Sequence, residues 1–383
     1  MCGSWTFEPN SDFRNITLER EFEMKKKPGL ILNPAELPRL FQSSLEALEP
    51  TWRNSKFLVA YSGGLDSSAL LQLTALNLAP GQAAAAHLNH GWRGPASDRD
   101  QAFAARTAAE LGLVFITEKG DPVSLARHRG KGLEEAARLV RYDFLARAAR
   151  DWGADFILTA HQADDQAETI LMNLLKGTGP GGLAGIPPRR PLATLAVLRP
   201  LLAFSRRQLK DWLELRSLTW LEDESNYDRR FLRNTVRLEL MPGLKQRNPR
   251  FLEALGRSAA IIRAEEDFWQ SRLAELWPRV VRTESPVGIE MDRSSLAILS
   301  LAERRRLVYA GLTRIQRAWN LINEPVTFAA VETALGLAAE GHRGLDLPGG
   351  VRASVEGPVL RLTVASRLAS RVFIASKEGM GAV

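Results

Sequence analysis

Cysteine is almost absent from this sequence, since Cys2 is the only one among 383 residues. A single thiol beside the N-terminus excludes intrachain disulfides, cysteine-rich zinc sites, iron–sulfur clusters held by several thiolates and two-cysteine redox cycles. The sequence also lacks a run of about 18 apolar residues, which a membrane helix would need, and the basic-then-apolar pattern of a signal peptide. Together these absences predict a soluble, cytoplasmic protein without a membrane partner.

Positive charge is only slightly in excess. The sequence has 51 Lys and Arg residues against 44 Asp and Glu residues, a formal net charge of +7. Such a balance favours a polyanionic partner without requiring one. The excess is concentrated in residues 227–250, where seven basic residues outnumber two acidic ones. A run of this kind is usually a solvated helix face, but it is also the pattern expected of a surface that binds a phosphate backbone.

Short apolar runs alternate with segments of helical periodicity over the first half of the chain. This alternation is typical of an α/β fold with a doubly wound parallel sheet, similar to a Rossmann fold, whose ligands bind beyond the carboxyl ends of the strands. Strands are predicted at residues 56–61, 83–88, 114–117 and 156–160, and helices at residues 65–78, 97–111, 133–151 and 163–176.

The second half of the chain has a different pattern, which begins after a Gly/Pro-rich stretch at residues 177–191. Helices are predicted at residues 205–217, 231–241, 249–277, 301–318 and 327–340, with short strands around residues 347–350. Residues 1–23 carry five acids and no clear period, and a start of translation at Met24 is one hypothesis for them. The predicted organisation is an N-terminal extension at 1–29, an α/β catalytic domain at 30–225, a mostly helical domain at 226–325 and a small α+β region at 326–383.

A glycine-rich motif, S-G-G-L-D-S at residues 62–67, directly follows the first predicted strand and opens a helix. Its glycines let backbone N–H groups approach an anion, and the helix N-terminus adds about half a positive charge. Its hydroxyl groups can donate to phosphate oxygens, whereas its carboxylate implies Mg²⁺ between itself and the phosphate. The alternative is an ordinary glycine-rich turn, and the motif is not a Walker A sequence, which the chain lacks. The residues predicted to bind ATP are Ser62, Gly63, Gly64, Leu65, Asp66 and Ser67, with Asp66 as a Mg²⁺ ligand.

Two further motifs carry polar groups next to predicted strands or on a helix. The sequence H-L-N-H-G-W-R-G at residues 87–94 forms a loop that can contact a nucleotide or substrate, and a purely structural loop is the alternative. Its two histidines have no other soft ligand nearby, which argues against a metal site. In E-E-A-A-R-L-V-R-Y at residues 134–142, Arg141 lies on the polar side of a helix, where it either reaches an anionic transition state or belongs to a salt-bridged solvent face.

The motif T-A-H-Q-A-D-D-Q-A-E-T at residues 159–169 places three acids, Asp164, Asp165 and Glu168, in the first turns of a helix. Acids are favoured at helix N-termini for electrostatic reasons alone, which is the structural alternative. Three acids together with His161, at the end of a strand and opposite a phosphate-binding loop, exceed that need. They indicate Mg²⁺ binding or the recognition of a cationic substrate.

These motifs occur in order with R-P-L-L at residues 199–202, W-L-E-D-E-S-N at 220–226 and R-N-T-V-R at 233–237. The set resembles tRNA(Ile)-lysidine synthetases, a family of N-type ATP pyrophosphatases in the PP-loop superfamily. The resemblance implies that ATP activates C2 of the wobble cytidine of tRNA(Ile) with a CAU anticodon and that pyrophosphate leaves. Free L-lysine then attacks C2 with its ε-amine and expels AMP, which yields lysidine. The family is often dimeric, and the sequence itself shows no interface.

The resemblance also implies roles for individual residues. It makes ATP and Mg²⁺ the cofactors, held by the motif at 62–67, and gives Arg141 and His161 the task of stabilising the adenylated intermediate. It assigns lysine binding to Asp165 and Glu168. The residues expected to be catalytic are Asp66, Arg141, His161 and Asp165, and those expected to bind tRNA are Arg229, Arg230, Arg233 and Arg237.

Other readings remain at this stage. A tRNA 2-thiolation enzyme shares the ATP-splitting loop, but sulfur transfer needs thiolates or a cluster, and residues 3–383 contain no cysteine. A small-molecule synthetase of the NAD or GMP type leaves the basic stretch unexplained, and a catalytically dead RNA-binding protein does not explain the intact acids. The acceptor of the lysine proton also stays open among His161, a nearby carboxylate and the adenylate leaving group. Longer family members continue into a further tRNA-binding domain, of which this sequence shows no convincing copy.

Overall fold

The computed structural model describes residues 34–91, 94–121, 132–222, 232–319, 321, 326–341 and 344–365. The chain divides into two compact units, residues 1–263 and 264–383, and the division falls within one long helix, α12 (Phe251–Val280). The first unit therefore includes residues 232–247, which the sequence analysis assigned to a separate helical domain. The predicted N-terminal extension lies outside the described residues.

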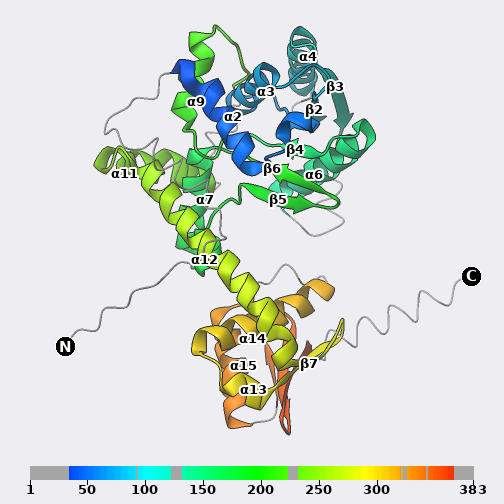
Figure 1. The fold of residues 1–383 in the computed structure, drawn as a ribbon, viewed down its shortest axis with the longest axis vertical. Coiled ribbons are helices and arrows are strands. Elements are labelled where there is room, and N and C mark those ends of the chain that lie inside the picture. The colour runs from blue at the N-terminus through cyan, green and yellow to red at the C-terminus, as the bar shows by residue number, and fades with distance from the viewer. Residues whose placement is uncertain are drawn as a thin grey trace, which may run out of the picture. The chain divides into compact units, whose positions relative to one another are not determined.

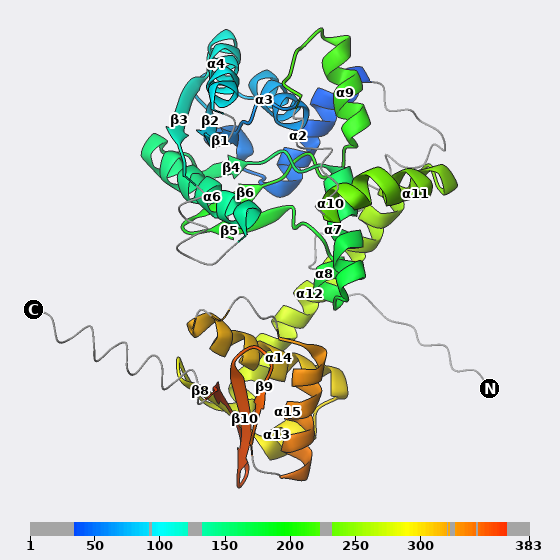
Figure 2. The same ribbon diagram turned by 180° about the vertical axis from the view of Figure 1, so that it is seen from behind.

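A six-stranded sheet forms the centre of the first unit, in the order β3-β2-β1-β4-β6-β5 (Figures 1 and 2). Neighbouring strands are parallel except β5, which pairs antiparallel with β6 at the edge. In the middle of the sheet, Phe57 of β1 is in register with Ala83 of β2 on one side and with Phe156 of β4 on the other. The strands are β1 (Phe57–Ala60), β2 (Ala83–Asn89), β3 (Val114–Lys119), β4 (Phe156–Leu158), β5 (Arg189–Leu192) and β6 (Leu195–Leu198).

Helices cover both faces of this sheet because successive side chains of each strand point to opposite faces. Phe57 and Val59 belong to a core with α2, α3, α4 and α9, whereas Leu58 belongs to a second core with α6. Figure 1 shows α3 and α4 on one side of the strands and α6 on the other. The helices of this unit are η1 (Pro34–Glu36), α2 (Leu37–Leu48), η2 (Trp52–Asn54), α3 (Leu65–Asn77), α4 (Pro95–Glu110), α6 (Leu133–Trp152), α7 (Ala163–Lys176), α8 (Pro180–Leu183), α9 (Arg206–Leu215), α10 (Leu232–Thr235), the π-helix η4 (Val236–Leu240) and α11 (Met241–Arg247).

The order of the strands creates a switch point between β1 and β4. From β1 the chain winds outward through β2 and β3, and it then returns to add β4 on the opposite side of β1. Loops that leave the carboxyl ends of two such strands diverge, and ligands of doubly wound sheets bind in the space between them. The loop after β1 contains residues 62–64 and the loop after β4 contains residues 159–162, so both principal motifs meet there.

The segment α10–η4–α11 packs against α7 of the first unit. Val236 and Met241 are buried with Ala167 of α7, and Leu171 lies at the margin of the same cluster. This apolar contact holds the basic segment beside the acidic first turns of α7. Residues 232–247 therefore belong to the first unit.

The second unit is an α+β fold with its own hydrophobic core. Its antiparallel sheet has the order β7-β8-β11-β10-β9, and α14 and α15 pack against it through residues such as Leu312 and Val331 (Figure 2). Its elements are β7 (Val281–Ser285), β8 (Gly288–Asp292), α13 (Arg293–Ala297), α14 (Leu301–Ala318), α15 (Phe328–Glu340), β9 (Leu345–Leu347), β10 (Val351–Glu356) and β11 (Val359–Val364).

The fold class predicted from the sequence is confirmed, with a doubly wound sheet, a helical segment and a small α+β C-terminal region. Strands β5 and β6 and the β7–β8 hairpin were not predicted. β5 begins within the Gly/Pro-rich stretch, and β6 is only four residues long. No helix in the described part of the chain combines the length and apolar character that crossing a membrane requires.

Candidate active site

The loop after β1 has a conformation that requires glycine at one position. Gly63 has a φ of +85°, and its carbonyl accepts a hydrogen bond of 2.8 Å from the backbone N–H of Leu221. Gly64 then caps α3, whose first N–H groups have no intrahelical partner and are available to an anion. The Ser62 and Ser67 hydroxyl groups lie 3.0 Å apart across the loop, so both stand beside the helix N-terminus.

Asp66 is the second residue of α3 and is mostly buried. Its Oδ2 accepts a hydrogen bond of 2.6 Å from Nη1 of Arg206, while its Oδ1 is buried and has no hydrogen-bond partner among the described residues. Burial raises the pKa of the Asp66 carboxyl to about 7, although the charge of Arg206 opposes the shift. A buried carboxylate oxygen without a partner is a suitable ligand for a hard cation such as Mg²⁺.

The described residues contain no cluster of three or more His, Cys, Asp or Glu side chains that could hold a metal by themselves. That composition fits Mg²⁺, which typically binds through one or two carboxylates, water and substrate phosphates instead of a complete protein cage. Asp66 is the one predicted metal ligand, and its position at the phosphate-binding loop is consistent with such a shared site.

The acids at the N-terminus of α7 are buried and are paired with cationic side chains of α10, η4 and α11. Glu168, 1% exposed, accepts from Arg233 at 2.8 Å and from Arg237 at 2.6 Å. Asp165 accepts from Arg233 at 2.6 Å, and Asp164 pairs with Lys245. Two predicted lysine-binding residues therefore hold two of the predicted tRNA-binding arginines.

These pairs have a clear electrostatic origin. Burial raises the pKa of Asp165, and the charge of Arg233 counteracts that shift. Burial disfavours the charged form of Arg233 in turn, but Asp165 and Glu168 more than compensate and raise its pKa. The first turns of α7 thus form a buried acidic cluster (Asp164, Asp165 and Glu168), which binds guanidinium and ammonium groups of this chain.

Arg206 joins the acidic cluster of α7 to the loop after β1. Its side chain bonds Asp66, and its backbone N–H donates to Oδ2 of Asp164 at 2.9 Å. Ser205 caps the helix α9, which begins at Arg206. Its hydroxyl accepts from the backbone N–H of Gln208, and its own backbone N–H donates to the side-chain oxygen of Gln208. The sequence analysis did not identify Arg206, since a single arginine after a capping serine carries no recognisable motif.

His161 lies at the end of the loop after β4, and the described contacts of its ring are on Nδ1. Thr159 Oγ1 lies 3.1 Å from Nδ1, and Nε of Arg199 donates to the same atom at 3.3 Å. Burial lowers the pKa of His161 to about 3, and the charges of Arg199 and then Arg138 act in the same direction. The imidazole is therefore neutral at physiological pH.

Three predicted site residues remain, Arg141, Arg229 and Arg230, and the structure describes only the first. Arg141 is exposed on α6, and its charge acts on His161 and on His90, whose pKa burial lowers to about 4. Arg229 and Arg230 lie outside the described residues. The tRNA-binding and catalytic roles of these residues stay predictions.

The histidine motif begins in the last three residues of β2, and two of its side chains contact neighbouring segments. His87 is buried, and its Nδ1 lies 3.0 Å from the carbonyl oxygen of Tyr61. Asn89 donates to Asp98 and Gln101 of α4 at 3.0 and 2.9 Å. These contacts explain His87 and Asn89 as residues that hold the end of β2 in place.

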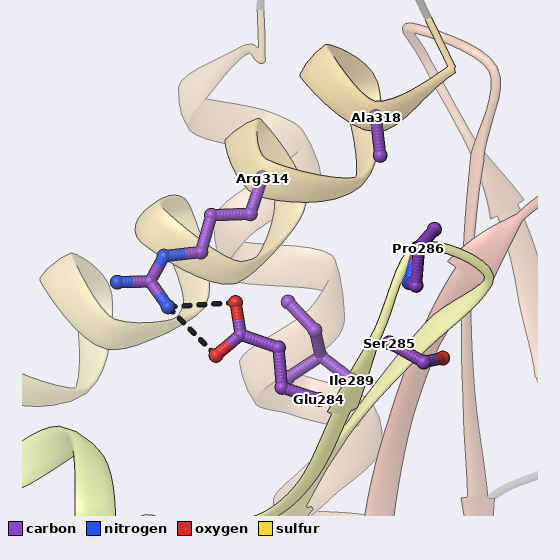
Figure 3. Close-up of a pocket in the computed structure, with 6 residues that line it drawn as sticks. All are labelled: Glu284, Ser285, Pro286, Ile289, Arg314 and Ala318. Atoms are coloured by element: carbon purple, nitrogen blue, oxygen red, sulfur yellow. Dashed lines mark hydrogen bonds and ion pairs between the residues drawn. The ribbon is translucent and has the colours of Figure 1, made fainter.

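A surface pocket of about 310 Å³ lies in the second unit, between α14 and the β7–β8 turn. Figure 3 shows Arg314 directed at Glu284, with which it forms two hydrogen bonds of 2.8 Å. Because its charged groups are paired with each other and its other walls include Ile289 and Pro286, this pocket has none of the features of the phosphate and cation sites in the first unit.

The chain is similar to several known proteins. The chain is 39% identical over 323 residues to a tRNA(Ile)-lysidine synthase of Symbiobacterium thermophilum, a match that covers 80% of this chain and 64% of the relative. It is 40% identical over 322 residues to that of Thermus thermophilus, covering 84% and 59%. The chain thus spans about three fifths of the length of these curated relatives. Among solved structures, the U34-tRNA thiolase NcsA from Methanococcus maripaludis aligns with a TM-score of 0.49 and 18% identity, over 60% of this chain and 78% of that one.

A family model described as the PP-loop domain matches residues 37–244, which is more than half of the chain. The match begins at α2, includes all six strands of the first unit's sheet and ends within α11. It therefore contains the loop after β1, the acidic cluster of α7 and the basic segment as far as residue 244, which includes Arg233 and Arg237. The chain belongs to the PP-loop domain family.

Proposed function

We propose that this protein ligates free L-lysine to C2 of the wobble cytidine of tRNA(Ile) with a CAU anticodon. ATP first adenylates the cytidine and releases pyrophosphate. The ε-amine of lysine then forms a bond to C2, the bond from C2 to the adenylate oxygen breaks, and AMP leaves. The relatives of about 40% identity, which are named tRNA(Ile)-lysidine synthases, support this proposal.

The observation that carries the proposal is a glycine loop suited to an anion in the same unit as a buried acidic cluster that binds cationic side chains. Asp165 and Glu168 already hold guanidinium groups at 2.6–2.8 Å, so their oxygens are placed and charged to accept N–H donors. A lysine ammonium offers the same kind of donor. A phosphate site beside an ammonium site is what a reaction between an adenylate and an amine requires.

The loop after β1 would bind the phosphates of ATP. Its glycine-dependent conformation, its two hydroxyl groups and the free N–H groups of α3 suit an anion. Asp66 would hold Mg²⁺, which supplies charge neutralisation of the pyrophosphate when bound. Arg206 donates to the same carboxylate, and its positive charge would stabilise the negative charge that develops on the phosphates.

The acids of α7 would bind and orient the lysine ammonium, but they would not make its amine nucleophilic. Its amine has an ordinary pKa of about 10.4, so about one molecule in a few thousand is nucleophilic at pH 7. Carboxylates orient the ammonium but raise its pKa, so another group must receive the proton as the C–N bond forms. Positioning alone contributes several kcal/mol to such a step.

The basic segment after residue 227 would bind the anticodon region of the tRNA. Arg233 and Arg237 connect this segment to the acids of α7. The arginines that would bind the tRNA are therefore paired with the carboxylates that would bind lysine. We expect Arg229 and Arg230 to add phosphate contacts, and we expect binding to weaken steeply with salt.

The test is a reaction of the purified protein with ATP, Mg²⁺, labelled lysine and tRNA(Ile) carrying a CAU anticodon. The expected result is one lysine incorporated for each pyrophosphate released, with methionine tRNA as the control that accepts none. Splitting of ATP with another acceptor, including sulfur incorporation into the tRNA from a persulfide donor, would overturn the proposal.

A further inference from the structure

Arg199 is a buried arginine for which the proposed reaction has given no role. It follows β6 directly and is 2% exposed. Its Nη1 donates to the carbonyl oxygen of Pro187 at 2.6 Å, and its Nε donates to Nδ1 of His161 at 3.3 Å. Among the described residues it forms no ion pair with a carboxylate, so the burial of its charge depends on neutral acceptors.

The bond to His161 determines which ring nitrogen carries the proton. A guanidinium has only N–H donors and does not lose its proton at physiological pH. Nδ1 must therefore present its lone pair, which leaves the proton of the neutral imidazole on Nε2. The Thr159 hydroxyl, 3.1 Å from Nδ1, is compatible with this arrangement because it can also donate.

The charged groups around the ring reinforce the same state. Arg199 approaches from the end of β6, Arg138 and Arg141 from α6, and Arg233 from α10, and all four disfavour an imidazolium. The Tyr142 phenol lies on α6 beside Arg199 and has its own pKa lowered by these arginines despite its burial. Protonation of Nδ1 would direct its N–H group at the N–H group of Arg199 Nε and would place an imidazolium charge beside the guanidinium charge.

We propose that Arg199 is a positioning residue that fixes His161 as the neutral Nε2–H tautomer. His161 then donates a hydrogen bond from Nε2 to an anionic oxygen of the adenylated intermediate and does not accept the proton of lysine. This inference rests on the proposed function. The proton released as the amine bonds to C2 then passes to a carboxylate of the acidic cluster of α7 or to the phosphate of the departing AMP.

The tautomer can be measured without substrates, by long-range ¹H–¹⁵N correlation spectra of protein labelled with ¹⁵N-histidine. The chain has only five histidines, and His161→Gln assigns the signals of His161. We expect the Nε2–H pattern, unchanged between pH 6 and pH 8. An Nδ1–H pattern, or titration of His161 within this range, would overturn the proposal whatever the protein catalyses.

Substitutions at Arg199 test the cause. Arg199→Met should give mixed tautomer signals and lower kcat at least roughly tenfold with the KM for lysine changed less than threefold, since a lost donor acts on the transition state. Arg199→Lys keeps a donor and should recover the Nε2–H pattern and part of kcat. If the methionine variant fails to fold, the wild-type and lysine spectra still decide. An unchanged tautomer in a folded Arg199→Met would refute the role of Arg199.

A matched control and a direct test of the donor role complete the experiment. Arg190 stacks on Tyr142 with its guanidinium 4.9 Å from the ring centre, so Arg190→Gln removes a nearby charge without a bond to His161 and should leave the tautomer unchanged. His161→Gln retains a donor but no base, so it should be at least roughly tenfold more active than His161→Ala. Equal loss in both variants would overturn the donor role, whereas absence of lysine incorporation by the wild type would overturn the proposed function instead.

Discussion

Replacement of Asp66 by asparagine should stabilise the ligand-free protein while it abolishes pyrophosphate release. Burial raises the pKa of Asp66 to about 7 from an ordinary value of 3.8. A difference of about three pKa units, at about 1.4 kcal/mol each, means that the ionised carboxylate costs the folded state up to about 4 kcal/mol. The side chain is 21% exposed, so solvent reduces this cost, and we expect a gain of about 2–4 kcal/mol in the free energy of unfolding at pH 8.

The sign of this effect with pH follows from proton binding. Above pH 7 the carboxyl is ionised in both states and the full cost applies. Between about pH 7 and pH 4 the folded protein binds the proton that the unfolded chain has lost, so the cost falls, and below about pH 4 it vanishes. The gain from Asp66→Asn should therefore be about 1–1.5 kcal/mol at pH 5 and largest at pH 8.

The assay is urea unfolding of wild type and Asp66→Asn at pH 5 and pH 8, without nucleotide or Mg²⁺. Asp211→Asn is the control, since Asp211 is 45% exposed and pairs with Arg207 at 3.7 Å on α9; it should change stability by less than about 0.5 kcal/mol. Equal stability of Asp66→Asn and wild type at pH 8, or a larger gain at pH 5, would refute the claim that the ion pair with Arg206 offsets only part of the cost of burying this charge.

The other predictions concern lysine, the basic segment and the phosphate loop. Glu168→Gln should raise the lysine KM at least roughly tenfold, because a hydrogen bond between charged groups is worth about 1.5–3 kcal/mol; an unchanged KM in a lysine titration would contradict its role. Arg237→Gln should raise the tRNA KM and lower the lysine KM about fivefold, because it removes a competitor for Glu168 worth about 1 kcal/mol; a raised lysine KM would show that Arg237 assists lysine. Gly63→Ala should lower stability by about 1–3 kcal/mol in thermal unfolding, because φ is +85° and the new Cβ would lie 2.8 Å from Leu221. Gly64→Ala, whose nearest atom would be 3.7 Å away, should cost less than half as much.

The sequence predicted those parts of the fold in which the local pattern and the tertiary environment agree. The helix predicted at residues 163–176 has these bounds in the structure, because Gln162 and Asp165 form a capping box at its start and Gly177 follows its end. The strands β5 and β6 could not be predicted in the same way. They pair as a short antiparallel hairpin whose outer strand, β5, forms the sheet edge. Arg189 and Pro191 leave β5 without an apolar run, and β6 has only the four apolar residues Leu195–Leu198.

The site was predictable where residues are adjacent in the sequence, and not where they meet through the fold. Ser62 and Ser67, or Asp165 and Glu168, are close along the chain, so spacing alone placed them on one loop or one helix turn. Arg206 lies 140 residues from Asp66, and Arg199 lies 38 residues from His161. No local pattern signals such contacts, because they arise from the pairing of β4 with β6 and from the packing of α9.

The pairing of basic and acidic groups changes the meaning of the positive charge in residues 227–250. Arg233, Arg237 and Lys245 are held by acids of α7, so their charge is balanced in the ligand-free protein. If the protein acts as proposed, tRNA phosphates that bind these arginines would leave the buried carboxylates without partners, which is unfavourable unless another cation replaces the arginines. Lysine would supply that cation, whereas lysine alone would have to displace the arginines without compensation. Each ligand therefore lowers the cost of binding the other, and because coupling of this kind is reciprocal, tRNA should tighten the binding of lysine by the same factor by which lysine tightens the binding of tRNA.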